Sequence, residues 1–384
     1  GSVAAPGAPG PGRPVAGAML RLGIVGLPNV GKTTLFNAVA SAHAPAENYP
    51  FCTVEPNVGT VAVPDPRLDR LHAMLGVPRK VPATVEFVDV AGLVEGASRG
   101  EGLGNRFLAH LRDVDALLHV VRCFEGGGVA HVLGSVDPVR DRGIVQTELA
   151  LADLATVERA ADRAARLARS GDREAAADLA FLERVRDALG RGRPARAVAR
   201  TPEERAALRT LGLLTAKPVL YVANVAPEAA GTAEDPRVAA LRRAVAEDEP
   251  DARVLPLAVE FEAELAGMPP EERAEFLELA GLSEPGLPRL VREGYALLGL
   301  VTFFTFNDSE VRAWTIPEGT RAAEAAGVIH SDFERGFIRA EVVPYDVFLE
   351  AGSMKAARER GLVRSEGRDY VVRDGDIVLV RFHV

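Results

Sequence analysis

The stretch Gly26–Thr33, read GLPNVGKT, decides the fold, because this spacing of glycines, lysine and threonine allows a backbone to wrap around a polyphosphate. Leu22–Val25 before it reads as a short buried strand, and Thr34–Val39 after it continues as an apolar-periodic helix. Main-chain N–H groups and the helix N-terminus would then face the phosphates. The stretch predicts a phosphate-binding loop (P-loop) between a strand and a helix.

Side chains of this loop can supply the charge and the metal ligand that a triphosphate requires. Lys32 would neutralise the β- and γ-phosphates, and the Thr33 hydroxyl is placed to bind the magnesium ion that bridges them. The residues of the loop expected to contact the nucleotide are Asn29, Val30, Gly31, Lys32, Thr33 and Thr34.

A second motif, Asp89-Val90-Ala91-Gly92, follows a run of apolar and β-branched residues that reads as a strand. It would place the Asp89 carboxylate near the magnesium ion and the Gly92 amide near the γ-phosphate. Thr53 lies between the two motifs, where a switch loop would bring its hydroxyl to the metal. The alternatives are a strand-ending aspartate in a turn for Asp89 and an ordinary loop threonine for Thr53.

Leu93 follows the Asp-x-x-Gly motif, at the position where Ras-like GTPases carry the glutamine that orients the attacking water. A leucine can neither donate nor accept a hydrogen bond, so another residue must position the water. His119 lies in an apolar strand and His110 in a helical stretch, and both are expected to be structural. His131, in a glycine-containing loop, has the setting that a catalytic histidine needs; an ordinary surface histidine is the alternative.

Composition favours an ordinary globular protein. The chain has 384 residues, of which 47% are hydrophobic and 26% charged, which leaves room for two or three domains. A net charge of -9 argues against a chain-wide nucleic-acid surface but not against a local basic patch. Cys52 and Cys123 indicate neither a disulfide framework nor a zinc site, and no apolar run is long enough to span a bilayer. A cytoplasmic location is expected.

The pattern along the chain predicts three structured parts after a disordered tail over residues 1–18. Residues 19–142 and 213–298 alternate β-branched runs with helical patterns, as a largely parallel α/β domain does. Residues 143–212 interrupt that domain with an antiparallel helical hairpin, in which Val157 and Leu167 would face Leu182. Residues 299–384 contain short strands and read as a small α+β domain. Strands are expected at 301–306, 311–316, 337–343 and 377–382, and a helix at 321–326.

Together these motifs resemble the YchF family, the Obg-related ATPases, over Met19–Val384. The resemblance is carried by Gly26–Thr33, Asn48–Asn57, Asp89–Gly104, Val120–Phe124 and Ala325–Arg339. It implies a P-loop NTPase G domain, an inserted hairpin and a C-terminal domain similar to a TGS domain. It also implies a cytoplasmic, slowly turning-over nucleotide hydrolase that binds the ribosome, with ATP preferred over GTP.

The same resemblance assigns roles to two residues. His131 matches the family's hydrolysis-promoting histidine. Asn29 matches the asparagine that binds a monovalent cation in related potassium-activated NTPases. A potassium ion there would supply the positive charge that an arginine finger provides elsewhere.

Base preference can be argued from Asn224–Glu228, NVAPE, which stands where GTPases carry N-K-x-D. Without the lysine and the aspartate, the site lacks the usual partner for the guanine N1–H and amine groups. The family's glutamate would lie three residues after Asn224, whereas Glu228 lies four after it, so the role of Glu228 is open. The S-A-K-like stretch aligns with Ala258–Glu260. Recognition is expected to rest on main-chain groups near Asn224 and Val225, with ATP preferred and dual use open.

Several functions stay open at this point. The leading hypothesis is an ATPase switch that docks on the ribosome, on its large subunit, in translation or a stress response. The alternatives are a nucleotide-gated RNA- or ribosome-binding protein with negligible turnover, a GTP-preferring GTPase and, last, a small-molecule kinase. RNA contact is plausible through the TGS-like domain, although a solvated surface explains its arginines equally well. Neither a membrane nor DNA is expected as a partner, and a monomer is expected.

Overall fold

The computed structural model describes residues 20–42, 57–90, 103–126, 131–230 and 235–383. Contacts divide the chain into two compact units. The first comprises Arg21–Val39 and Val88–Gly286, and the second takes Ala40–Phe87 and Leu287–Val384. The domain boundaries inferred from the sequence remain predictions, and they differ from this division by assigning residues 40–87 and 287–298 to the nucleotide-binding domain.

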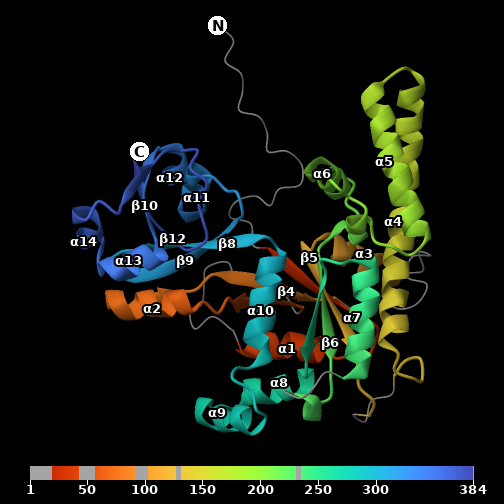
Figure 1. Cartoon of the computed structure of the whole chain (residues 1–384), viewed down its shortest axis with the longest axis horizontal. Coiled ribbons are helices and arrows are strands. Elements are labelled where there is room, and N and C mark those ends of the chain that lie inside the picture. The colour runs from red at the N-terminus through yellow and green to blue at the C-terminus, as the bar shows by residue number, and fades with distance from the viewer. Residues whose placement is uncertain (1–19, 43–56, 91–102, 127–130, 231–234, 384) are drawn as a thin grey trace. The chain divides into compact units, whose positions relative to one another are not determined.

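A parallel sheet forms the centre of the first unit (Figure 1). The strands of this sheet that lie wholly in the first unit are, in spatial order, β1 (Arg21–Val25), β5 (Ala116–Arg122), β6 (Val219–Asn224) and β7 (Arg253–Leu257). Every residue of β5 and β6 is buried, as expected for parallel strands that are covered on both faces. The end of β4 (Thr84–Asp89) lies beside β1, because the Val90 N–H donates to the Ile24 carbonyl at 3.3 Å. The carboxyl ends of these strands therefore meet at one edge, where open α/β sheets bind ligands.

Helices of the first unit precede and follow these strands. They are α1 (Lys32–Ala42), α3 (Leu103–Arg112), α4 (Pro138–Arg169), α5 (Arg173–Gly190), α6 (Pro202–Thr210), α7 (Pro236–Asp248), α8 (Val259–Gly267) and α9 (Pro270–Leu279). One-turn helices lie at η2 (Ala195–Ala197), η3 (Leu214–Ala216) and η4 (Pro227–Ala229). Within the described ranges, no helix combines the length and the apolar character that a membrane crossing requires.

Helices α4 and α5 run side by side and share a hydrophobic core (Figure 1). A short turn joins them, and Asp172 caps α5 by accepting from the N–H groups of Glu174 and Ala175. Val157 and Leu182 are buried in this core, whereas Leu167 is 50% exposed, contrary to the expectation that it faces α5. Ten residues at 100° each leave Leu167 about 80° away from the direction of Val157 on the helix, so it turns out of the seam.

The second unit contains a mixed sheet. Its strand order is β11 (Arg364–Glu366), β10 (Phe337–Pro344), β12 (Asp376–Phe382), β8 (Leu300–Phe306), β9 (Glu310–Pro317) and β3 (Arg79–Val81). The four strands predicted after residue 299 are confirmed to within one residue at either end. The helices here are α2 (Pro66–Leu75), α10 (Gly286–Leu297), α11 (Ala322–Ile329), α12 (Ser331–Arg335), α13 (Tyr345–Ala351) and α14 (Met354–Glu359), and β2 (Val58–Ala62) also belongs to this unit.

One strand of that sheet comes from an unexpected part of the chain. The sequence pattern placed residues 79–81 in the nucleotide-binding domain, but β3 pairs in parallel with β9, with Lys80 opposite Val311. Arg79 and Glu310 form an ion pair at 2.7 Å across the same two strands. A three-residue strand at a sheet edge is too short to leave a periodic signal, so the sequence could not show this pairing.

Two leucines of the α4/α5 helix pair, one buried and one half-exposed, test the core that these helices share. Leu182→Ala should destabilise the pair by about 2–3 kcal/mol, because it opens a cavity in a closed cluster. Hydrogen exchange of the α5 amides should then be about thirtyfold or more faster. Leu167→Ala, the matched control at a half-exposed position, should leave exchange nearly unchanged. Equal effects of the two substitutions would contradict this account of the seam.

Candidate functional site

The P-loop adopts the backbone conformation that its glycines permit. Gly31 has φ +101°, and a Cβ atom there would lie 2.7 Å from Nδ2 of Asn224. Gly26 has φ +155°, and its Cβ would lie 2.5 Å from the Val120 carbonyl oxygen. Asn29 is the one non-glycine residue with positive φ, at 62°, in the described part of the chain. Asparagine tolerates this left-handed conformation better than most residues, so the loop fits its sequence.

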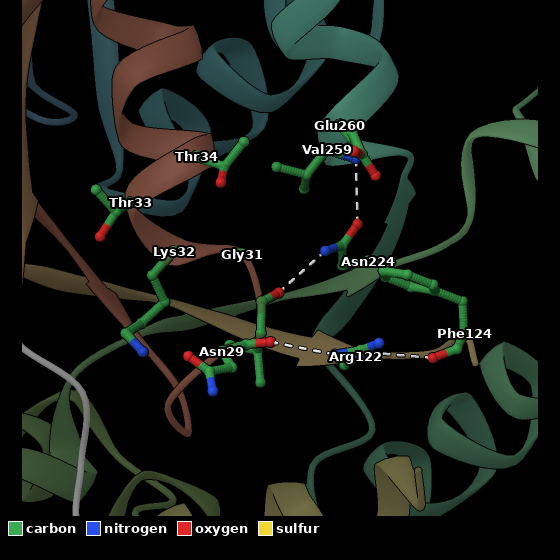
Figure 2. A pocket seen from close by; sticks show the side chains of 11 residues that line it. Asn29, Gly31, Lys32, Thr33, Thr34, Arg122, Phe124, Asn224, Val259 and Glu260 are labelled. Atoms are coloured by element: carbon green, nitrogen blue, oxygen red, sulfur yellow. Dashed lines mark hydrogen bonds between the residues drawn. The ribbon is translucent and has the colours of Figure 1, made fainter. Parts of the chain in front are cut away.

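A cavity of about 350 Å³ lies against this loop (Figure 2). It is lined by Asn29, Val30, Gly31, Lys32, Thr33, Thr34, Arg122, Phe124, Asn224, Val259 and Glu260. The predicted nucleotide-binding residues from Asn29 to Thr34 and Asn224 are therefore brought together. Val225 is buried outside this lining, and its N–H donates to the Leu257 carbonyl at 3.1 Å.

Lys32 lies almost entirely out of solvent at the start of α1. Its Nζ donates to the Leu27 carbonyl oxygen at 2.6 Å, so the loop's own backbone holds the ammonium group. Burial lowers the pKa of Lys32 to about 8, and the nearby Asp89 carboxylate opposes this shift. An anion that enters the cavity would therefore meet a desolvated positive charge, whose attraction is stronger than it would be in water.

Thr33 and Asp89 come together from the two predicted motifs. The Thr33 hydroxyl donates to Oδ2 of Asp89 at 2.8 Å, although 56 residues separate them in the sequence. Two adjacent oxygen groups beside a phosphate loop suit magnesium, which takes oxygen ligands and usually binds through few protein groups and substrate phosphates. Among the described residues, no group of three or more His, Cys, Asp or Glu side chains could hold a metal by itself. Thr53, Gly92 and Leu93 lie outside the described residues.

Asn224, at the end of β6, connects the two sides of the cavity. One N–H of its amide donates to the Val30 carbonyl at 3.0 Å, and its oxygen accepts from the Val259 N–H at 3.1 Å (Figure 2). The side chain is buried, so both hydrogen bonds are shielded from water. Asn224 thus fixes the first residue of α8 relative to the phosphate loop.

Sequence reasoning did not assign Arg122, Phe124 or Glu260 to the lining of the cavity. Phe124 offers an aromatic face, and the Arg122 guanidinium lies over its ring at 4.6 Å. Arg122 also donates to the main-chain oxygens of Phe124 at 3.2 Å and of Asn29 at 3.5 Å. Glu260, the second residue of α8, is exposed and contributes a carboxylate. Glu228 is exposed on η4, outside the lining of the cavity.

His131 does not lie in the cavity lining but in a separate buried contact. Its Nε2 is 2.6 Å from Oδ2 of Asp141, and its Nδ1 accepts from the Leu133 N–H at 3.1 Å. Arg140 donates to the other oxygen of Asp141 at 2.8 and 3.0 Å. Because Nδ1 accepts, Nε2 carries the ring proton and donates it to the carboxylate. The sequence predicted a glycine-containing loop that suits a catalytic histidine, but in this conformation both ring nitrogens are engaged.

The other two candidate histidines differ from each other. His119 is buried in β5, where burial, followed by the nearby Arg142 charge, lowers its pKa to about 3. It therefore stays neutral at physiological pH, in agreement with a structural role. His110 is exposed near the end of α3 and does not line the cavity.

Two protein-family models match separate parts of the chain. Residues 21–142 match the family model MMR_HSR1, described as a 50S ribosome-binding GTPase. Residues 300–383 match the model YchF-GTPase_C, whose description reads "Protein of unknown function (DUF933)".

Individual proteins are similar over nearly the whole chain. A Bacillus subtilis protein named ribosome-binding ATPase YchF is 49% identical over 95% of this chain and 100% of its own length. The rat Obg-like ATPase 1 is 40% identical over 96% of this chain and 93% of its own. The solved structure of the Schizosaccharomyces pombe YchF GTPase is 36% identical, with a TM-score of 0.86, over 97% of this chain and 99% of that one. On this similarity, and with its P-loop nucleotide-binding fold, the chain belongs to the YchF family.

Proposed function

We propose that this protein is a ribosome-associated P-loop ATPase that acts as a nucleotide-dependent switch in translation or in a stress response. The observation that carries the proposal is the phosphate-loop cavity, with Lys32 and the Thr33–Asp89 pair on its loop side. The names of the relatives, ribosome-binding ATPase and Obg-like ATPase, support the choice of nucleotide and of partner.

In the proposed mechanism, the loop binds the phosphates through main-chain N–H groups and through Lys32. Thr33 and Asp89, with Thr53 from outside the described residues, would hold a magnesium ion, which neutralises phosphate charge when bound. Asn29 is proposed as the ligand of a potassium ion, and Gly92 as a main-chain donor to the γ-phosphate. The described oxygen pair fits this metal, because magnesium prefers carboxylate and hydroxyl oxygens.

Preference for ATP over GTP follows from what the end of β6 lacks. No aspartate follows Asn224 at the position where GTPases accept the guanine N1–H and amine groups, and Glu228 lies outside the cavity lining. A site that leaves those guanine donors unpaired loses binding energy for guanine. We therefore assign ATP as the preferred substrate.

His131 is proposed to orient the attacking water, since Leu93 cannot. Its hydrogen bonds to Asp141 and Leu133 must open before a ring nitrogen can meet a water molecule. Asp141 thus opposes hydrolysis in this conformation, which would keep intrinsic turnover slow. A signal that releases His131 from Asp141 would accelerate hydrolysis.

The docking surfaces are assigned to two parts of the chain. The α4/α5 pair is proposed as the hairpin inserted into the G domain, and the C-terminal sheet as a TGS-like domain. Both are proposed to contact the large ribosomal subunit, with RNA contact through basic side chains of the TGS-like domain such as Arg335 and Arg339, which are exposed. The protein is proposed to act as a monomer.

Ribosome-dependent hydrolysis tests the whole proposal. Phosphate release from ATP, in magnesium and potassium, should rise severalfold when intact ribosomes are added to the full chain. Lys32→Ala should weaken nucleotide binding by at least about tenfold, because it removes a charge-assisted contact to phosphate. Ribosome binding that depends on nucleotide but brings no phosphate release would favour a nucleotide-gated binding protein instead.

The role of His131 is tested with variants of both partners in its contact with Asp141. His131→Ala should slow hydrolysis by about a hundredfold, in the range for loss of a group that handles the proton of an attacking water, while the Kd for ATP stays near that of the wild type. Asp141→Asn should speed intrinsic hydrolysis by about fivefold, because a neutral hydrogen bond replaces a charge-assisted one.

The double variant gives the control for this pair. Asp141→Asn should have no effect on a His131→Ala background if the carboxylate acts through the histidine. The rate of single-turnover phosphate release is measured for both single variants and the double variant. An acceleration that persists without the imidazole, or a matching loss of ATP affinity in His131→Ala, would refute the assigned roles.

The pKa of Lys32 predicts a proton linkage of nucleotide binding. In the free protein burial holds this pKa at about 8, and the negative phosphates of a bound nucleotide would raise it. Binding should therefore take up protons between pH 8 and 10, and ATP affinity should fall as the pH rises through that range. Calorimetry at pH 8.5 in two buffers of different ionisation enthalpy measures the uptake. Equal heats in both buffers would contradict the proposed contact between Lys32 and phosphate.

A further inference from the structure

The groups of Asn224 cannot by themselves distinguish adenine from guanine. Its oxygen accepts from Val259, and one of its two N–H groups donates to Val30. The second N–H can only donate a hydrogen bond, and the purine N7 is an acceptor in both adenine and guanine. Beyond the missing partner for guanine, positive selection of adenine therefore requires a different group in the cavity.

The remaining lining residues leave one side chain that can accept a hydrogen bond. Outside the phosphate loop and Asn224, the described residues that line the cavity are Arg122, Phe124, Val259 and Glu260. Phe124 and Val259 are apolar, and a guanidinium such as that of Arg122 has donors only. Glu260 is thus the one acceptor side chain among them.

We propose that the Glu260 carboxylate selects adenine by accepting a hydrogen bond from the amine at its C6 position. Guanine carries a carbonyl oxygen at C6, which a carboxylate repels and cannot bind. This inference rests on the proposed function, because it assumes that a purine nucleotide occupies the cavity with its phosphates at the P-loop.

The position of Glu260 agrees with the order of groups on the purine. N7 and the C6 substituent are neighbours on one edge of the base, while N1 and C2 follow further along. In the protein, Asn224 holds the N–H of Val259, and Glu260 is the next residue. In the proposed orientation, N7 of the base lies at the Asn224 amide and its C6 substituent lies towards Glu260, which lines the same cavity.

The backbone around Glu260 is held at fixed points. The Val225 N–H bonds to the Leu257 carbonyl at 3.1 Å, and β6 and β7 are in register with Asn224 opposite Leu257. α8 begins two residues later, so a rigid segment carries the carboxylate.

The test compares three nucleotides on two variants. The nucleotides are non-hydrolysable triphosphates of adenosine, guanosine and purine riboside, the last of which has no substituent at C6. Glu260→Gln removes the charge and keeps the shape of the side chain. Glu264→Gln is the matched control, because Glu264 is exposed one turn further along α8 and does not line the cavity. Calorimetric titration of the full chain gives each Kd.

Glu260→Gln should raise the Kd of the adenosine analogue by about tenfold, which is in the range for loss of a hydrogen bond to a charged group. The same substitution should leave the Kd of the purine riboside analogue unchanged. The Kd of the guanosine analogue should be unchanged or lower. Glu264→Gln should resemble the wild type with all three. Equal losses for all three analogues would mean a non-specific effect, and a loss confined to the guanosine analogue would mean that Glu260 reads the N1–C2 edge. Either result, or no change at all, overturns the proposal.

Failure of the proposed function would look different from failure of this inference. Binding of non-hydrolysable analogues is independent of turnover, so Glu260-dependent selectivity without ribosome-stimulated phosphate release would contradict only the ATPase proposal. A protein that releases phosphate on the ribosome and prefers the adenosine analogue, with that preference unchanged in Glu260→Gln, would contradict only the assignment of Glu260.

Discussion

The site depends on one buried amide, the side chain of Asn224. It connects the Val30 carbonyl in the phosphate loop with the Val259 N–H at the start of α8, so two segments more than 200 residues apart in the sequence are held together. Removing the amide would leave a buried carbonyl and a buried N–H without this partner, at a cost of about 1–3 kcal/mol for each. The close approach also explains why residue 31 is glycine, since a Cβ there would collide with Nδ2 of Asn224.

A second constraint lies at the beginning of α4. Asp141 binds His131 on one side of the helix, and the next residue, Arg142, forms ion pairs with Asp248 at 2.8 Å and Glu249 at 3.2 Å. Arg142 and Glu249 are both buried, and Arg142 also lies over the ring of Tyr221 in β6. Buried charges of this kind keep their partners, because an unpaired charge would be costly. A shift of α4 therefore disturbs the environment of His131 and the sheet together, although α4 extends far beyond both.

The sequence predicted the parts of this architecture that have a local signal. The loop at 26–33, the strands around it and the four strands after residue 299 all carry spacing or periodicity that a single segment reveals. The hydrogen bond between His131 and Asp141 was not predictable, because residues ten apart approach each other only through the path of the loop before α4. Phe124 and Glu260 were missed as lining residues for a related reason. Each lies in a stretch that resembles a family motif, but only the sheet places a strand end beside a helix start.

The charges of the cavity also constrain how a nucleotide can enter it. Lys32 places a positive charge in the phosphate loop, whereas Glu260 places a negative one at the start of α8. A net charge of -9 repels an anion over the whole molecule, but screening limits that effect to about 8 Å at physiological salt. The charges of Lys32 and Glu260 therefore dominate the electrostatic potential within the cavity. A nucleotide with its phosphates towards Lys32 is attracted by the ammonium group at the loop. The reversed orientation would bring phosphate against the Glu260 carboxylate, which repels it. The arrangement that selects a base by its C6 group thus also fixes the direction in which the triphosphate lies.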